Sequence, residues 1–265
     1  MLRIQKAVMK AKDAKEHQLI RQRSEAAKTN SPLESLKYTK TKVETVHPDY
    51  LEENRIVAGF PSHKQSQIFR TLRTHVIKKM RENKLRSLAV TSPSSGEGKS
   101  LVAANLAVAL AMEVNQTVLL VDLDLRNPGI AKYFNIEQQN GFLDYLKGNC
   151  ELEDIMVNPG IDRLVVVPGH GTAINSSEII SSPKMRGFYN ETRARYKSRI
   201  VIYDLPPILP SDDVLSSISN IDSALLVLEE GRNSEKEIVR AIRQLQGTPL
   251  LGSVINKFHK GGWMI

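Results

Sequence analysis

Short runs of apolar residues alternate with longer stretches of helical periodicity along most of the chain. The runs are rich in valine, isoleucine and leucine without strict apolar–polar alternation, a pattern typical of strands buried on both faces. Six such runs occupy residues 87–92, 117–123, 163–169, 199–205, 223–229 and 250–256. Helical stretches separate most of them, notably at 100–114 and 233–246. This rhythm predicts an α/β fold with a doubly wound, mostly parallel sheet.

The N-terminal part of the chain lacks this rhythm. Residues 1–28 have the composition of a charged helix, and residues 36–63 contain two prolines and predict an extended arm beside the domain. A helical pattern begins at residue 64 and continues to residue 84. The sequence therefore predicts a basic N-terminal arm over 1–53, partly helical or disordered, followed by an α/β domain over 54–265.

Positive charge is concentrated in this arm. The 265 residues carry a net charge of +8, and residues 1–50 hold 11 Lys+Arg and 6 Asp+Glu, so 11 − 6 = +5 of it lies there. Such an arm attracts anionic lipid, an acidic partner or nucleic acid. No aromatic residue lies among the basic residues of 1–37, whereas binding of single-stranded nucleic acid uses aromatic stacking. Nucleic acid is therefore not the expected partner.

Cysteine content and hydropathy bear on the location of the protein. The single cysteine, Cys150, excludes an internal disulfide and a cysteine-rich metal site, and it fits a reducing cytoplasm. No apolar run approaches the roughly 18 residues that a bilayer crossing needs. Residues 1–18 lack the apolar core of a signal peptide. The sequence predicts a cytoplasmic protein.

The sequence TSPSSGEGKS, residues 91–100, lies between the first predicted strand and an apolar helix. It matches the phosphate-binding pattern G-x-x-x-x-G-K-[ST], except that Pro93 replaces the first glycine. Its glycines allow backbone N–H groups to surround an anion at a helix N-terminus. Lys99 is expected to reach the terminal phosphates and Ser100 to bind Mg²⁺. The expected nucleotide contacts are Ser95, Gly96, Glu97, Gly98, Lys99, Ser100 and Leu101.

Carboxylates end two other predicted strands. Asp122 and Asp124 lie two residues apart after one strand, and Asp204 follows another. Open parallel sheets bind ligands at the carboxyl ends of their strands, where the phosphate loop also emerges. We therefore expect one site at this edge of the sheet. Its predicted metal-binding residues are Ser100, Asp122 and Asp204, and its predicted catalytic residues are Lys99, Asp122, Asp124 and Asp204.

Together these motifs resemble those of the bacterial tyrosine kinases of exopolysaccharide and capsule export. SPSSGEGKS resembles the family's Walker A motif, VLLVDLDLRNP its Walker A′ motif and IVIYDLPP its Walker B motif. The resemblance covers roughly residues 54–258 and implies a P-loop NTPase fold of the MinD/ParA type, with a kinase domain over 54–265. It also implies transfer of the ATP γ-phosphoryl group to tyrosine, with ATP and Mg²⁺ as cofactors, in regulating polysaccharide biosynthesis, export or chain length.

In such a reaction Asp122 is expected to accept the tyrosine proton or to hold the tyrosine oxygen in line, and Asp124 to assist the metal. Asn256 follows the last predicted strand, where it either binds the adenine amino group or is a turn residue. Arg126 either serves the site or forms a surface ion pair.

The segment QIFRTLRT, residues 67–74, resembles the family's Glu-x-x-Arg-x-x-Arg helix, which docks on a neighbouring subunit. Gln67 replaces the glutamate, while Arg70 and Arg73 are present. The resemblance implies a homo-oligomeric ring in which Gln67 forms no ion pair. Residues 175–185, NSSEIISSPKM, resemble the family's loop before a helix that approaches the active site.

The family also commonly carries a tyrosine-rich C-terminal tail, but this sequence has no tyrosine after Tyr203. We therefore expect any self-phosphorylation to occur elsewhere. Tyr38 and Tyr50, in the predicted extended arm, are either phosphoacceptors or packing residues.

The resemblance further implies a separate membrane-spanning activator, because this sequence contains no spanning segment. The basic arm suits the acidic tail of such a protein or the anionic inner leaflet. The expected location is cytoplasmic and peripheral to the inner face of the plasma membrane.

Two alternatives share this fold. Assembly ATPases of the ParA/MinD type carry a signature lysine at the second position of the loop, where this chain has Ser94. Their lysine reaches a partner's phosphates across a dimer interface, which serine cannot do. The second alternative is a nucleotide-gated scaffold of the polysaccharide machinery that hydrolyses ATP slowly without phosphorylating tyrosine.

Overall fold

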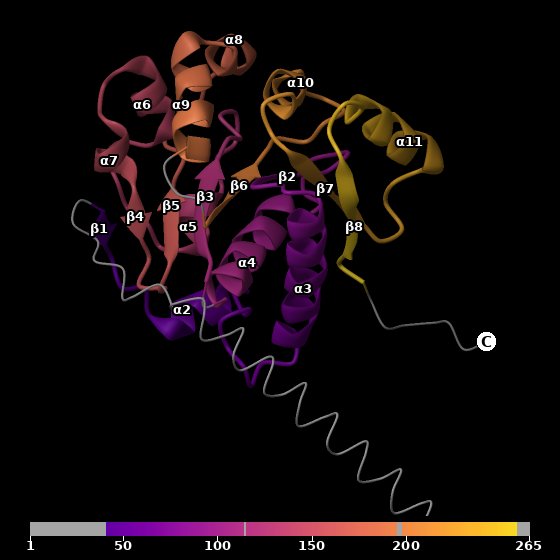
Figure 1. Ribbon diagram of the computed structural model, residues 1–265, viewed down its shortest axis with the longest axis horizontal. Coiled ribbons are helices and arrows are strands. Elements are labelled where there is room, and N and C mark those ends of the chain that lie inside the picture. The colour runs from indigo at the N-terminus through magenta and orange to yellow at the C-terminus, as the bar shows by residue number, and fades with distance from the viewer. Residues whose placement is uncertain (1–40, 114, 195–197, 259–265) are drawn as a thin grey trace, which may run out of the picture. The chain divides into compact units, whose positions relative to one another are not determined.

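An eight-stranded sheet organises the part of the chain that the computed structural model describes, residues 41–113, 115–194 and 198–258 (Figure 1). The strand order is β1-β4-β5-β3-β6-β2-β7-β8. All neighbours pair in parallel except β4 and β5, which are antiparallel. The strands are β1 (Lys42–Val43), β2 (Ser87–Thr91), β3 (Thr117–Asp122), β4 (Val157–Asn158), β5 (Leu164–Val167), β6 (Arg199–Asp204), β7 (Ser223–Glu229) and β8 (Leu250–Asn256).

Each of the six predicted strands is present, and the prediction of a mostly parallel sheet is confirmed. The sequence did not reveal β1 and β4, because two residues are too few to show a hydrophobic period. The helices are α2 (Pro48–Glu53), α3 (Ser66–Glu82), α4 (Lys99–Ala111), α5 (Ile130–Tyr133), α6 (Phe142–Lys147), α7 (Leu152–Ile155), α8 (Ser176–Ile180), α9 (Pro183–Ala194), α10 (Asp213–Ile218) and α11 (Glu235–Gln244).

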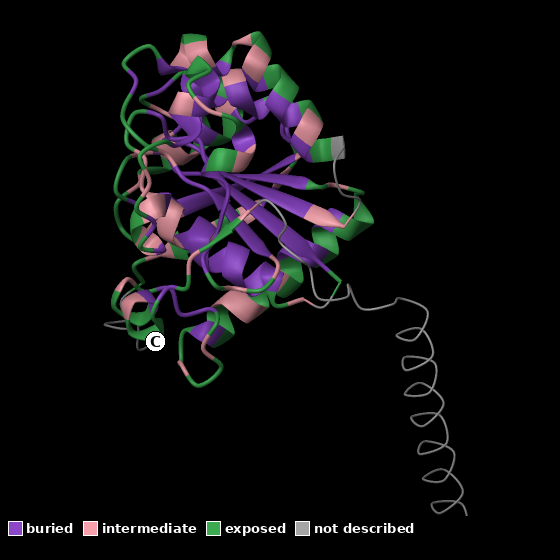
Figure 2. Cartoon of the chain, turned by 90° about the vertical axis from the view of Figure 1, so that its left-hand side faces the viewer, coloured by how far each residue is buried: buried purple, intermediate pink, exposed green. Residues whose placement is uncertain are grey.

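Helices cover both faces of the sheet, which explains why the strands are apolar throughout. Successive residues of β2 point to opposite sides, so that Leu88 and Val90 join one core cluster and Ala89 joins the other. Helices α3 and α4 pack side by side on the first face, and α6, α9 and α11 contribute to the cluster on the second (Figure 1). The central strands are buried between these layers (Figure 2).

The start of the folded domain differs from the expected boundary at residue 54. The folded domain begins before that residue, because β1 pairs with β4 and the side chain of Leu51 in α2 enters the core. Residues 42–53 therefore belong to the domain, and only the segment before them remains as a candidate arm. The predicted helix over 1–28 lies outside the described residues.

A buried asparagine ties the entry segment to the domain. Asn105 lies in α4 with no exposed surface. Its Oδ1 accepts hydrogen bonds from the backbone N–H groups of Val57 (2.9 Å) and Ala58 (3.1 Å), and its Nδ2 donates to the carbonyl oxygen of Arg55 (2.9 Å). One side chain thus satisfies three backbone groups of a segment without regular structure, as buried polar groups require.

We expect Asn105→Leu to lower the free energy of unfolding by about 2 kcal/mol or more, because two buried N–H groups lose their acceptor. Asn83→Ala is the control, since the Asn83 side chain caps α3 at an exposed position, and we expect a loss below about 1 kcal/mol there. Urea unfolding measures both values. Equal stability losses in the two variants would contradict the anchoring role of Asn105.

Candidate active site

The predicted site residues gather at the carboxyl ends of three adjacent strands, β3, β6 and β2. The phosphate loop leaves β2, while Asp122 and Asp204 end β3 and β6 and are direct partners in the parallel register. An open pocket of about 460 Å³ lies at this edge. Its lining includes Ser95, Gly96, Gly98, Lys99, Ser100, Leu101 and Asp124.

The loop has the backbone conformation that an anion-binding cradle needs. Gly96 and Gly98 have φ angles of 84° and 91°, a region that residues with a Cβ atom rarely adopt. Gly98 is also the residue preceding α4, so that the positive end of the helix dipole faces the pocket. A Cβ atom on Gly98 would lie 2.1 Å from Nδ2 of Asn256. Both conformation and space therefore require glycine at this position.

Lys99 connects the loop to the carboxylates. Its Nζ lies 2.8 Å from Oδ2 of Asp124 and 3.7 Å from Oδ1 of Asp204, and it donates to Oγ of Ser100 at 3.2 Å. Burial by itself would lower the pKa of Lys99, but the charges of Asp204 and Asp124 outweigh it and raise that pKa above its ordinary value. The ammonium group therefore remains charged inside the protein, held by two strand ends.

Asp204 offers unused ligand atoms. Its carboxylate has no exposed surface. The Lys99 ammonium, 3.7 Å away, and the Ser100 hydroxyl are its polar neighbours, and neither forms a hydrogen bond of normal geometry with it. Burial raises the pKa of Asp204, and the charge of Lys99 and the hydroxyl of Ser100 offset this only in part. Buried carboxylate oxygens beside the hydroxyl group of Ser100 form the oxygen donor set that Mg²⁺ prefers. These residues fit the metal.

Asp122 organises the Walker A′ loop. Its Oδ2 accepts hydrogen bonds from the N–H groups of Gly129 (2.8 Å) and Ile130 (2.9 Å), and its Oδ1 accepts one from Asp124 N–H (3.2 Å). Burial raises the pKa of Asp122, and the charge of Asp204 raises it further. Lys99 contacts Asp124 and Asp204 more closely than Asp122. The predicted catalytic and metal-binding roles of Asp122 remain predictions.

Residues at or after the ends of β7 and β8 form hydrogen bonds to the phosphate loop. Asn256 Nδ2 donates to the carbonyl oxygen of Glu97 (2.8 Å), and Lys257 Nζ donates to that of Gly96 (2.8 Å). The Glu97 carboxylate accepts from the N–H of Ser94 (2.9 Å) and from Asn233 Nδ2 (2.7 Å). Lys257 and Asn233 could not be predicted from the sequence, because nothing in their local pattern indicates a partner more than 130 positions away.

The predicted assembly residues lie on α3, where the two arginines contact their own chain. Gln67 is exposed. Arg70 Nη2 donates to the carbonyl oxygen of Pro61 at 3.4 Å. Arg73 forms an ion pair with Glu113, with 3.1 Å between Nε and Oε1. Their role in ring assembly remains a prediction.

Of the two candidate phosphoacceptors, Tyr38 lies outside the described residues. Tyr50 packs against the core, and its hydroxyl group donates to the carbonyl oxygen of Lys132 at 2.8 Å. In this conformation Tyr50 is a packing residue with an engaged hydroxyl, so acting as a phosphoacceptor would require it to leave Lys132.

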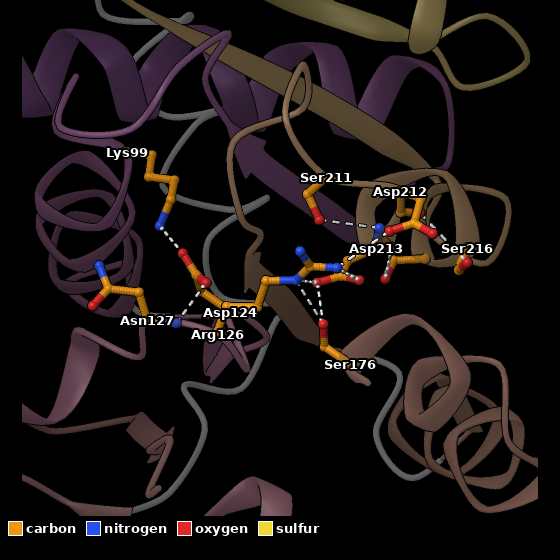
Figure 3. Close-up of polar contacts among 10 residues, drawn as sticks. Lys99, Asp124, Arg126, Asn127, Ser176, Ser211, Asp212, Asp213 and Ser216 are labelled. Atoms are coloured by element: carbon orange, nitrogen blue, oxygen red, sulfur yellow. Dashed lines mark hydrogen bonds and ion pairs between the residues drawn. The ribbon is translucent and has the colours of Figure 1, made fainter. Parts of the chain in front are cut away.

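Arg126 points away from Lys99 toward a second polar cluster (Figure 3). Its Nε lies 3.1 Å from Oδ2 of Asp213 and 2.8 Å from Oγ of Ser176. Asp213 and Ser176 have no exposed surface. Of the two alternatives for Arg126, the structure shows an ion pair, in which Asp213 is buried and Asp212 is exposed.

Comparison with known proteins shows the family of the chain. Residues 88–262 match the model of the CobQ/CobB/MinD/ParA nucleotide binding domain. The chain is 31% identical over 208 residues to the tyrosine-protein kinase YwqD of Bacillus subtilis, covering 78% of this chain and 86% of that protein. The crystal structure of the chimerical protein CapA2B2 superposes with a TM-score of 0.72 at 27% identity, covering 83% of this chain and 94% of that one.

The fold is also similar to that of the septum site-determining protein MinD from Pyrococcus horikoshii, in complex with Mg-ADP. There the TM-score is 0.55 and the identity 23%, covering 66% of this chain and 72% of that one. The chain belongs to the CobQ/CobB/MinD/ParA nucleotide-binding family and, within it, to the bacterial tyrosine-protein kinases.

A substitution of Asn256 can distinguish whether its side chain braces the phosphate loop or binds adenine. If Asn256 braces the loop, Asn256→Ala weakens the binding of Mg-ATP and Mg-GTP by the same factor, about 3- to 10-fold for one lost hydrogen bond. If it binds adenine, only ATP affinity falls. Calorimetric titration with both nucleotides measures this, with Asn220→Ala as a control at an asparagine that the pocket lining does not include.

Proposed function

We propose that this chain is an ATP-dependent protein tyrosine kinase that regulates the biosynthesis, export or chain length of an exopolysaccharide. The observation that carries the proposal is the position of Lys99. Its ammonium group lies beneath a glycine-rich anion cradle and between carboxylates from two strand ends. Membership in a family of tyrosine-protein kinases supports the choice of acceptor.

The geometry supports the following sequence of events. The phosphates of ATP enter the cradle, where the loop N–H groups bind them and Lys99 exchanges its contact with Asp124 for the β- and γ-phosphates. Ser100 and Asp204 would hold Mg²⁺, which when bound neutralises charge on the phosphates. Alignment and charge neutralisation are what this reaction requires.

In the transfer itself the tyrosine oxygen forms a bond to the γ-phosphorus as the bond to the β,γ-bridging oxygen breaks, and ADP leaves. The tyrosine proton passes to a carboxylate at the same edge. Asp122 and Asp124 are the candidates. Asp122 Oδ1 accepts a single backbone hydrogen bond of 3.2 Å, which leaves it capacity for one more donor. Asn256 and Lys257 keep the cradle in place during these events.

Two alternative functions have less support. An assembly ATPase of the ParA/MinD type needs a lysine where this chain has Ser94, and here the Ser94 N–H bonds to Glu97 within the same loop. A nucleotide-gated scaffold would bind ATP in the same pocket. The scaffold and the kinase differ only in whether phosphotyrosine forms. Mass spectrometry decides this point.

Incubation of the full chain with Mg-ATP and a synthetic glutamate–tyrosine polymer should yield phosphotyrosine. Lys99→Met should lower its formation by about 10²- to 10³-fold, as loss of a preorganised charge contact does. Lys147→Met is the matched control, because Lys147 is an exposed lysine on α6. Phosphate on Tyr38 or Tyr50 would identify self-phosphorylation sites. ATP turnover without phosphotyrosine on chain or polymer would favour the scaffold instead.

We further propose that a separate membrane-spanning protein activates the kinase, that copies of the chain assemble through α3, and that the basic arm holds the protein at the inner membrane face. Within residues 41–113, 115–194 and 198–258, no helix combines the length and apolar character needed to cross a membrane. The remaining support is the positive charge of the arm. Each lysine near an anionic surface contributes about 1 kcal/mol of binding free energy.

The arm can be tested by replacing Lys6, Lys10, Lys12 and Lys15 with glutamine. The full chain should sediment with vesicles of phosphatidylcholine and phosphatidylserine at low salt, and the quadruple variant should remain in the supernatant, because the attraction is electrostatic. Vesicles of phosphatidylcholine alone are the control. Equal sedimentation of both chains would remove the arm from the proposal.

A further inference from the structure

A polar cluster with a buried centre lies on the side of the Walker A′ loop away from Lys99, and its members Arg126 and Asp212 are exposed. Asp213, the first residue of α10, has no exposed surface, and its Oδ2 contacts Arg126 Nε (3.1 Å) and the hydroxyl group of Ser176 (2.7 Å). Arg126 Nη2 also reaches Asp213 Oδ1 and Asp212 Oδ1, each at 3.3 Å. The cluster therefore joins the Walker A′ loop to α8 and α10, three segments that are distant in the sequence (Figure 3).

The same loop carries Asp124, two residues before Arg126. Asp124 points toward Lys99 and Arg126 points the opposite way, into the cluster (Figure 3). Leu125, between Asp124 and Arg126, is also held to another segment, because its carbonyl oxygen accepts a hydrogen bond from the N–H of Ala173 at 2.9 Å. Within the loop, Asn127 N–H donates to Asp124 Oδ1 at 3.0 Å. The side of the loop remote from Lys99 is thus fastened to segments outside the nucleotide pocket.

We propose that Arg126 is a positioning residue: by binding the buried Asp213 and Ser176, it fixes the Walker A′ loop so that Asp124 stays opposite Lys99. The planar guanidinium group suits this task, because its fork bonds several acceptors at once and remains charged. The buried carboxylate makes the contact persistent, since an unpaired buried charge is strongly unfavourable. This inference rests on the proposed kinase function only for its effect on turnover.

The proposal predicts a split between catalysis and binding. Arg126 does not touch the phosphate loop, so its loss should leave the KM for ATP within about 3-fold of the wild-type value. The kcat should fall by about 100-fold, which is the typical effect of misplacing a reacting group by 1 Å. Hydrogen exchange should become faster in residues 123–130 and stay unchanged in residues 93–101, whatever the catalytic activity.

The experiment uses the full chain and the double variant Arg126→Met/Asp213→Asn. Removing both charges avoids the unpaired Asp213 that Arg126→Met alone would leave, so the fold is preserved. Arg126→Lys keeps the charge but loses the fork, and its kcat should be intermediate. Arg193→Met is the matched control, because Arg193 pairs with Asp222 at 2.6 Å outside the site. Readouts are hydrogen exchange, and kcat and KM with Mg-ATP and the glutamate–tyrosine polymer.

Faster exchange in the loop together with a lower kcat in the double variant supports the proposal. If hydrogen exchange in residues 123–130 is as slow in the double variant as in the wild type, the proposal is wrong. A lower kcat together with that result would mean that Arg126 contacts the substrate itself. Faster exchange with an unchanged kcat also overturns it, because the position of Asp124 would then not matter. If the wild-type chain forms no phosphotyrosine but hydrogen exchange in the loop is faster in the double variant, Arg126 still positions the loop and the kinase function is wrong.

Discussion

The site depends on one buried cation held between two anions. The Lys99 ammonium lies 2.8 Å from a carboxylate oxygen of Asp124 and 3.7 Å from one of Asp204. These carboxylates repel each other, and the Lys99 ammonium offsets that repulsion. The other cationic side chains among the described residues that line the pocket are Arg55 and Lys132. The Lys99 ammonium lies where incoming phosphates can compete with the carboxylates for it. In the proposed mechanism, the phosphates of ATP replace Asp124 as the partner of Lys99.

The parallel sheet makes this exchange possible, because it brings three strand ends to one edge. Asp122 and Asp204 are neighbours in register, although 82 positions separate them in the sequence. Side chains from other parts of the chain then hold each loop in place. Asn256 and Lys257 brace the phosphate loop, and Arg126 braces the Walker A′ loop through Asp213. Lys99 lies between two loops that are each fastened on their outer side.

Much of this was predictable from the sequence, because some signals are local. The apolar runs located six strands, and the loop pattern located Lys99 and Ser100 at the start of α4. What the sequence did not reveal depends on long-range contacts. Asn105 inside an alanine-rich helix gives no sign that it binds the segment of Arg55, Val57 and Ala58, which the sequence predicted to be part of an extended arm beside the domain.

The assignment of Asn256 illustrates the same limit. Its position at the end of the last strand was predictable, but its hydrogen bond to Glu97 was not, since register alone does not determine where an amide side chain points. Likewise, the sequence left open whether Arg126 serves the site or forms a surface ion pair, and it did not show that Asp213 would be buried.

A crystal structure of the chain with Mg²⁺ and a non-hydrolysable ATP analogue tests the exchange of partners at Lys99 most directly. We expect Lys99 Nζ to lie within hydrogen-bond distance of the β- and γ-phosphate oxygens and to have left Oδ2 of Asp124. A nucleotide bound elsewhere, with the contact between Lys99 and Asp124 intact, would contradict it.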